Sequence, residues 1–324
     1  MPLFSLEELD RAHAVVAAHV PVTAAYERVL LSAEVGASVI VKHENHTPTN
    51  AFKVRGGLVY LARLARERPQ VLGVVSATRG NHGQSLAYAA RAAGKRAVIV
   101  VPEGNNPAQV AAMRGFGAEV RVHGRDFQEA REHSVELAAG LGLEMVAPFH
   151  PDLVLGVATY AKELFGQAGP LDAVYVPVGM GSGICGLITV RDLLGLPTRI
   201  VGVVAAAAPA TALSVAAGRV VTTPEAATFV DGVACREPMA DAIEIMCAGA
   251  ERIVTVSEDQ AAEAMRVLYR TTRQMPEPAG AIALAGLLTE RDQARGQRVA
   301  VIQTGGNCDE AMVADVLAGA TPSA

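Results

Sequence analysis

Lys53 stands at the start of a helical pattern, directly after a polar, turn-prone run at residues 46–50. The amide dipoles at a helix start disfavour a positively charged ammonium group. Burial beside Phe52 and Val54 would remove hydration and disfavour the charge further. A neutral amine can attack a carbonyl carbon, so this position suits a lysine that forms a Schiff base. Taken alone, however, the stretch is more typical of a solvated surface lysine.

A glycine-rich loop follows the apolar strand pattern at residues 173–178 and precedes a second helical pattern; it consists of Gly179, Met180, Gly181, Ser182 and Gly183. Glycines let backbone N–H groups converge on an anion, and the helix dipole favours negative charge there. The loop therefore predicts a phosphate cradle, with a tight packing turn as the competing interpretation. A dinucleotide site is disfavoured, because no acidic residue ends a second strand at the expected distance.

Two further polar motifs follow strand patterns. Residues 76–84 read Ser-Ala-Thr-Arg-Gly-Asn-His-Gly-Gln, and residues 303–307 read Gln-Thr-Gly-Gly-Asn. Singly, each motif fits an ordinary turn, in which His82 caps or packs, Arg79 is solvated and Thr304 ends a strand.

Strand and helix patterns alternate along most of the chain, which predicts parallel sheets with helices on both faces. Apolar strand patterns occur at 39–42, 71–75, 97–101, 120–122, 145–147, 173–178, 200–204 and 299–302. In such folds, ligands bind at the carboxyl ends of the strands, where the motifs above lie. Residues 221–238 are the least regular stretch and are expected to be a surface connection.

In order and spacing, the motifs around Lys53, Asn81, Gly181 and Thr304 together resemble the fold-type II pyridoxal-phosphate enzymes, over about residues 23–307. The resemblance is strongest to the serine/threonine dehydratase (ammonia-lyase) and serine racemase branch. It implies pyridoxal 5'-phosphate as cofactor and an α/β, tryptophan synthase β-like fold. That fold has two doubly wound parallel-sheet units with the cofactor in the cleft between them. The implied domains are a large cofactor-binding domain at 1–70 and 149–324 and a small substrate-loop domain at 71–148.

The resemblance also implies roles for single residues. Lys53 would carry the cofactor and act as the base, Phe52 would pack beside the ring, and Thr304 would face the pyridine nitrogen. The phosphate would be held by Gly179, Met180, Gly181, Ser182 and Gly183, although Met180 and Ser182 depart from the nearly unbroken glycine of the family. Asn81 would bind the 3' oxygen, and the substrate would be bound by Thr78, Arg79, Gly80, Asn81 and His82.

Two departures from the family pattern bear on the reaction. Where racemases carry a serine that protonates the α-carbon, this chain has Arg79, which stays protonated near neutral pH and cannot serve as that acid or base. Racemisation is therefore disfavoured. Some relatives bind a divalent cation through carboxylates after the strand pattern at 200–204, but here that stretch is alanine-rich, so no metal is expected.

These observations predict a catabolic lyase that converts an L-β-hydroxy-α-amino acid to a 2-oxo acid and ammonia. Serine and threonine are the default substrates, and Arg79 and Met180 leave room for 3-hydroxyaspartate or phenylserine. The alternatives are a racemase or a β-replacement synthase of the same fold. A catalytically silent ligand-binding paralogue is the non-enzymatic alternative, which an intact Lys53 disfavours.

The composition disfavours other classes of function. The 324 residues are 51% hydrophobic with a formal net charge of −5, and no Lys/Arg-rich run indicates nucleic-acid binding. No signal peptide or membrane span is recognisable, and the four cysteines lack CxxC spacing. We therefore expect a cytoplasmic protein with free thiols and no membrane partner. Its expected partners are an amino-acid substrate and further copies of itself, in a homodimer or higher homo-oligomer.

Overall fold

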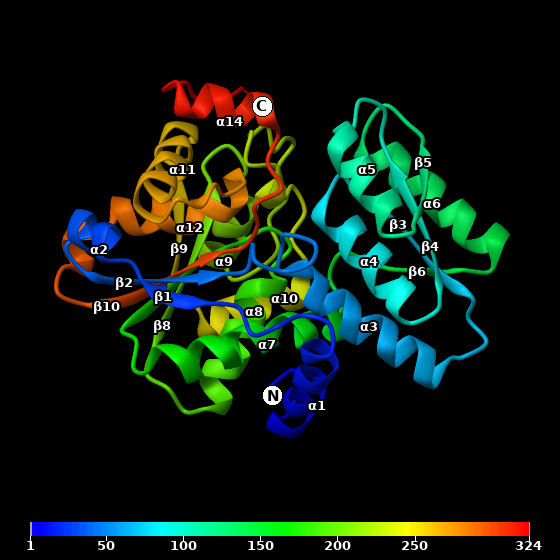
Figure 1. Ribbon diagram of the computed structural model, residues 1–324, viewed down its shortest axis with the longest axis horizontal. Helices are drawn as coiled ribbons and strands as arrows, with labels where there is room; N and C mark the ends of the chain where they lie inside the picture. The colour runs from blue at the N-terminus through cyan, green and yellow to red at the C-terminus, as the bar shows by residue number, and fades with distance from the viewer. Residues whose placement is uncertain (1, 324) are drawn as a thin grey trace. The chain divides into compact units, whose positions relative to one another are not determined.

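The predicted alternation of strands and helices produces two separate sheets in the computed structural model, which describes residues 2–323 (Figure 1). The chain divides into two compact units. The first contains residues 2–6, 22–46 and 160–323, and the second contains residues 7–21 and 47–159.

The first unit is built on a six-stranded sheet with the order β1-β2-β10-β7-β8-β9. The edge strand β1 is antiparallel to β2, whereas all other neighbours are parallel. The central strands read as almost unbroken apolar runs, as expected when helices cover both faces of a sheet. The strands are β1 (Ala25–Glu27), β2 (Ser38–His43), β7 (Ala173–Pro177), β8 (Arg199–Ala205), β9 (Arg252–Val256) and β10 (Arg298–Gln303).

Helix α12 (Pro278–Thr289) lies in the core of the first unit, and residues 278–287 of it are all buried. Its small residues permit this depth: a Cβ added at Gly286 would lie 2.6 Å from a methyl group of Val203 on β8. The other helices of this unit are α2 (Val29–Val35), α8 (Ser182–Leu193), α9 (Ala210–Ala217), α10 (Ala240–Gly249), α11 (Glu258–Thr272), α13 (Arg291–Ala294) and α14 (Glu310–Leu317), with a 3₁₀ turn, η1 (Asp231–Val233).

The second unit has a four-stranded, fully parallel sheet with the order β5-β4-β3-β6. Its strands are β3 (Gly73–Ala77), β4 (Arg96–Val101), β5 (Glu119–Val122) and β6 (Glu144–Met145). Its helices are α1 (Leu6–Ala17), α3 (Lys53–Glu67), α4 (Asn81–Ala92), α5 (Pro107–Gly115) and α6 (Phe127–Leu141), together with the first half of α7 (Pro151–Ala168). None of the helices within residues 2–323 combines the length and the apolar character needed to cross a bilayer.

Each sheet has a topological switch point, where consecutive connections leave in opposite directions. In the first unit it lies between β10 and β7, and in the second between β3 and β6. Ligands of doubly wound sheets bind outside the carboxyl ends of strands at such points. The glycine loop follows β7, Thr304 follows β10, and the Thr78 loop follows β3. The predicted α/β class with parallel sheets is thus confirmed, and the motifs lie at its ligand-binding edges.

The units divide the chain at other positions than the predicted domains did. Residues 47–70 and 149–159 belong with the second unit, because α3 packs directly on α4 and α7. A Cβ at Gly57 would lie 2.4 Å from Ser85 Oγ, and one at Gly156 would lie 2.3 Å from the carbonyl oxygen of Arg55. Glycine at these two positions lets the helices approach until their backbones touch.

The segment at residues 221–238 is irregular, as predicted, but the expectation that it lies on the surface is wrong. Phe229, Val230, Val233 and Cys235 are buried. The carboxylate of Glu258 holds the segment in place by accepting hydrogen bonds from Thr228 Oγ1 (2.8 Å) and from the Phe229 amide (3.0 Å).

Strand β2 carries a buried ion pair. Lys42 Nζ lies 2.8 Å from Glu163 Oε2, and the exposed fractions of the two side chains are 0% and 4%. The ammonium also donates to the carbonyl oxygen of Thr23 (2.9 Å) and to Gln167 Oε1 (3.1 Å). Because its donors are satisfied within the unit, the charge can remain inside the core.

Candidate active site

Lys53 is the first residue of α3, as the sequence pattern predicted. Its Nζ lies 4.6 Å from the centre of the Phe52 ring, which is a cation–π distance. Ser85 Oγ on α4 donates to the Lys53 carbonyl oxygen at 2.6 Å. This contact fixes the backbone from which the lysine side chain projects. Both Lys53 and Phe52 are half-buried.

The loop from Thr78 to Gly83 joins β3 to α4 within the second unit. The Gly80 amide donates to Thr78 Oγ1 at 3.2 Å, and Asn81 begins the helix. A Cβ at Gly83 would lie 2.6 Å from Thr78 Cγ2, so glycine lets the loop close on itself. Asn81 and His82 thereby occupy the first turn of α4, where backbone N–H groups have no intrahelical acceptor. Such a turn suits a carboxylate ligand.

His82 is a neutral histidine. Its Nε2 is buried and has no hydrogen-bond partner among the described residues. Burial first, and the charge of Lys53 second, lower the pKa of His82 to about 3. The ring therefore offers one uncharged nitrogen that no group of residues 2–323 satisfies.

Arg79 lies on the same loop with an exposed side chain. Its carbonyl oxygen accepts from Asn105 Nδ2 at 3.0 Å, which holds the backbone. In the part of the chain that the structure describes, no carboxylate pairs with its guanidinium group. The loop thus presents an uncompensated positive charge.

The glycine loop connects β7 to α8 in the first unit. Gly181 is the N-cap residue of α8 with φ +98°, a left-handed conformation that favours glycine, and it supplies no side-chain cap. A Cβ at Gly179 would lie 2.7 Å from the Gly232 carbonyl oxygen. The first N–H groups of a helix have no intrahelical acceptor, so an uncapped start of α8 is suited to an anion.

The two non-glycine residues of this loop, Met180 and Ser182, are half-buried. Cys235 Sγ lies 3.7 Å from Met180 Sδ, so the irregular segment at 221–238 packs against the loop. On the other side, Tyr160 Oη donates to the Gly183 carbonyl oxygen at 3.1 Å. These contacts hold the loop from both flanks.

Thr304 follows β10 and is buried. Its Oγ1 donates to the Ala279 carbonyl oxygen at 3.3 Å. In the register of β10 and β7, Val301 pairs with Tyr175, so Gln303 and Pro177 end their strands at the same edge. The structure therefore brings Thr304 and the glycine loop to one end of the same sheet.

Two titratable groups near the strand ends were not predicted from the sequence. His43 ends β2, and its Nε2 lies 2.6 Å from an Arg28 guanidinium nitrogen. Burial, then the charges of Arg28 and His46, lower the pKa of His43 to about 3. The second group is Glu277, a buried carboxylate just before α12. Its only sequence signal is a charged residue before Pro278-Ala279-Gly280.

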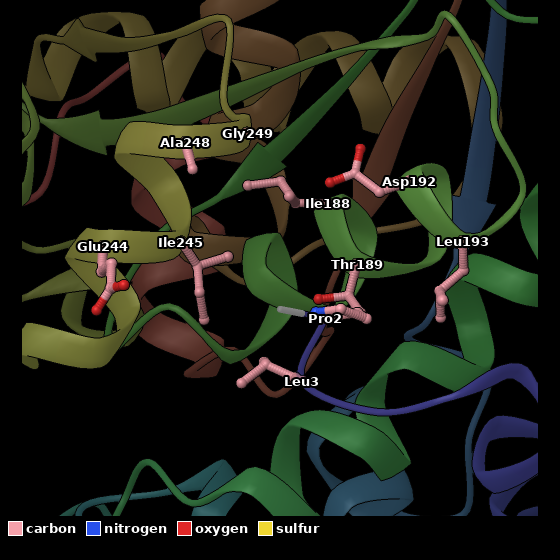
Figure 2. Close-up of a pocket in the computed structure, with 10 residues that line it drawn as sticks. All are labelled: Pro2, Leu3, Ile188, Thr189, Asp192, Leu193, Glu244, Ile245, Ala248 and Gly249. Carbon is pink, nitrogen blue, oxygen red and sulfur yellow. The ribbon is translucent and has the colours of Figure 1, made fainter.

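A cavity of about 460 Å³ lies elsewhere in the first unit, against α8 and α10 (Figure 2). None of the predicted site residues lines it. Its walls are formed by Pro2, Leu3, Ile188, Thr189, Asp192, Leu193, Glu244, Ile245, Ala248 and Gly249. The described residues also bring together no group of three or more His, Cys, Asp or Glu side chains suited to a metal ion.

A parallel α/β fold with a helix-start lysine, a glycine cradle and polar strand-end loops defines a pyridoxal-phosphate enzyme of fold type II. The family model described as "Pyridoxal-phosphate dependent enzyme" matches residues 18–305, and the chain belongs to that family. The family resemblance predicted from the motifs is thereby confirmed.

Several curated relatives are similar over most of this chain. The biosynthetic L-threonine dehydratase of Salmonella typhimurium is 34% identical over 280 residues, which are 86% of this chain and 54% of that protein. This chain therefore spans about half the length of the curated biosynthetic dehydratases that it matches. The L-threo-3-hydroxyaspartate ammonia-lyase of a Pseudomonas species is 35% identical over 290 residues, covering 89% of this chain and 91% of that protein.

Solved structures agree with this assignment. The processed threonine deaminase isoform 2 from Solanum lycopersicum superposes with a TM-score of 0.89 at 28% identity, covering 98% of this chain and 96% of that one. A second threonine deaminase, of bacterial strain T.th., gives a TM-score of 0.88 at 33% identity, covering 94% of this chain and 99% of that one.

Proposed function

We propose that the protein is a pyridoxal-phosphate-dependent ammonia-lyase that dehydrates an L-β-hydroxy-α-amino acid to a 2-oxo acid and ammonia. The observation that carries the proposal is Lys53 at the start of α3, in a chain whose glycine loop forms an uncapped helix start. The relatives named above carry dehydratase or ammonia-lyase names, which supports the same reaction class.

The residues present fit the cofactor. Gly179 and Gly181 leave backbone surface that a Cβ would obstruct, and the start of α8 suits a phosphate. Thr304 offers a neutral hydroxyl to the pyridine nitrogen, and Asn81 offers an amide to the 3' oxygen. Met180, Ser182 and Gly183 complete the phosphate loop, and Phe52 packs beside the ring. When bound, pyridoxal phosphate supplies an electron sink for the charge released at the substrate's α-carbon.

Lys53 has two roles in this proposal. Its Nζ first holds the cofactor, and once the substrate amine has displaced it, the freed amine takes the α-proton. The β-hydroxyl leaves as water, and hydrolysis of the released enamine consumes one water and yields the 2-oxo acid and ammonia. Thr78, Gly80, Asn81 and the start of α4 bind the α-carboxylate.

His82 belongs to the same substrate loop. Its neutral ring matches a polar group of the bound ligand, because Nε2 otherwise stays buried without a partner in the described chain.

Arg79 favours a substrate with a second carboxylate, such as 3-hydroxyaspartate. Its side chain is exposed on the substrate loop and pairs with no carboxylate of the described chain. A cation at this position also disfavours racemisation, because arginine does not exchange protons near neutral pH. The match to a 3-hydroxyaspartate ammonia-lyase over nine-tenths of both chains supports this choice.

The experiment that tests the proposal combines cofactor mapping with a substrate screen. After borohydride reduction of the pyridoxal-phosphate-loaded protein, peptide mapping should find the cofactor on Lys53, and Lys53→Ala should show no turnover. Release of 2-oxo acid is then measured for serine, threonine, 3-hydroxyaspartate and phenylserine. Cofactor on another lysine, or no oxo-acid release from any of the four, would refute the proposal.

A further inference from the structure

Glu277 is a buried carboxylate to which the proposed reaction gives no role. It is only 7% exposed. It occupies the N-cap position of α12, yet its side chain forms no cap hydrogen bond. Ser, Thr, Asp and Asn are the residues that cap helix starts well. Capping therefore does not explain why a glutamate stands here, and its carboxylate must be used elsewhere.

The carboxylate lies against the turn that follows β10. Glu277 Oε2 accepts from the Asn307 amide at 3.2 Å, while the Glu277 amide donates to the Gly305 carbonyl oxygen at 3.1 Å. A Cβ at Gly305 would lie 2.4 Å from Glu277 Oε1, so this approach requires glycine. Hydrogen bonds in both directions thus join the start of α12 to the turn.

Thr304 shares this junction. Its Oγ1 donates to the carbonyl oxygen of Ala279, in the first turn of α12. The helix and the turn touch at a second pair of residues, because a Cβ at Gly280 would lie 2.4 Å from the Gly305 carbonyl oxygen. A shift of the turn away from α12 would therefore move Thr304 and change the direction of its hydroxyl.

We infer that Glu277 is a positioning residue for Thr304. Its carboxylate holds the turn at residues 305–307 against α12 and so fixes the Thr304 hydroxyl toward the cofactor's pyridine nitrogen. This inference rests on the proposed role of Thr304. The carboxylate is itself stabilised there by the Asn307 amide and by the positive end of the helix dipole.

Two conservative variants separate position from charge. Glu277→Gln keeps an acceptor oxygen at the same reach and removes the charge. Glu277→Asp keeps the charge but shortens the side chain by one methylene, so that the carboxylate no longer reaches the Asn307 amide. Glu290→Gln is the matched control. That carboxylate lies just after the other end of α12, where it binds Arg252 (2.6 Å) and Tyr175 (2.9 Å).

The first readout is hydrogen exchange in the cofactor-free protein, followed on peptides that contain residues 303–309. Losing a hydrogen bond to a charged acceptor should raise the exchange rate of the Asn307 amide roughly tenfold or more in Glu277→Asp. Glu277→Gln and Glu290→Gln should stay within about threefold of the wild type. Unchanged exchange in Glu277→Asp would overturn the inference, and so would equal effects of Asp and Gln, which would assign the effect to charge.

The second readout compares the binding of pyridoxal phosphate with that of its 1-deaza analogue, in which a C–H group replaces the pyridine nitrogen. Titration calorimetry should show that Glu277→Asp weakens the first ligand several-fold more than the second. Equal weakening would overturn the link to Thr304, even if exchange changes. If the wild-type protein binds neither ligand, the proposed function fails, while the exchange experiment still decides whether Glu277 holds the turn.

Discussion

Replacing Arg79 with glutamine tests the proposed substrate class directly. The guanidinium group is exposed on the substrate loop and pairs with no carboxylate of the described residues. If it binds a second substrate carboxylate, the loss should appear with 3-hydroxyaspartate and not with serine, which has no second carboxylate. Glutamine retains most of the length and polarity of arginine, so the charge is the main change.

The size of the effect follows from the chemistry of the contact. A hydrogen bond to a charged group contributes about 1.5–3 kcal/mol. Since about 1.4 kcal/mol corresponds to a factor of ten, kcat/KM for 3-hydroxyaspartate should fall roughly tenfold to a hundredfold. Solvent screening at an exposed loop places the expected value toward the lower end of this range. Salt should weaken the contact too, so raising ionic strength should lower the wild-type kcat/KM for 3-hydroxyaspartate more than that for serine.

The assay measures release of 2-oxo acid from 3-hydroxyaspartate, serine and phenylserine. Arg91→Gln is the matched control, because Arg91 is exposed in the last turn of α4 and the same charge is removed away from the loop. Equal losses on serine and 3-hydroxyaspartate would refute recognition of a second carboxylate. So would unchanged kinetics on all three substrates, which would leave Arg79 as a solvated loop residue.

Three further predictions concern the scaffold. Gly181→Ala places a side chain at φ +98°, with its Cβ 3.0 Å from that of Ala242, so thermal denaturation should show a loss of about 1–2 kcal/mol and calorimetry should show weaker cofactor binding. Lys42→Met leaves the Glu163 carboxylate buried without its ammonium, and urea denaturation should show a loss of roughly 3–5 kcal/mol; a loss below about 1 kcal/mol would contradict this. His43 has a folded-state pKa of about 3, below its usual 6.5, so the unfolded chain binds the extra proton and stability falls as pH drops through that window, by about 1.4 kcal/mol per pH unit. His43→Gln should remove this contribution, and equal acid sensitivity of both proteins in urea titrations at about pH 7, 5 and 4 would contradict it.

The parts of the site that could be predicted from the sequence are those governed by local chemistry. A lysine before a helical pattern, and glycines between a strand and a helix, specify their geometry within a few residues. The structure accordingly places Lys53 at a helix start and Gly181 at an N-cap. Helix bounds were less well predicted, because α8 begins at Ser182 and α4 at Asn81, earlier than the apolar pattern indicates.

Long-range contacts could not be read from the sequence. Glu277 becomes notable only when β10 and α12 meet, and nothing near it in the sequence points to Asn307. Burial of the segment at 221–238 likewise depends on Glu258, which comes later in the chain. His43 is neutral because a distant strand end covers it and Arg28 lies beside it. Each of these features arises from the tertiary fold, to which local propensity gives no access.

The positions of the non-glycine residues explain how one scaffold can serve different substrates. Gly179, Gly181 and Gly305 each allow an approach of about 3 Å or less that a Cβ would prevent, so they are constrained by the backbone itself. Met180 and Arg79 have no such constraint, since one packs by its sulfur on Cys235 and the other extends from an exposed loop. Substitutions at Met180 and Arg79 can therefore change which side chain the enzyme accepts while the glycines keep the strand-end loops in place. The selectivity of this enzyme should accordingly depend on Met180 and Arg79, and its ability to bind the cofactor on the glycines.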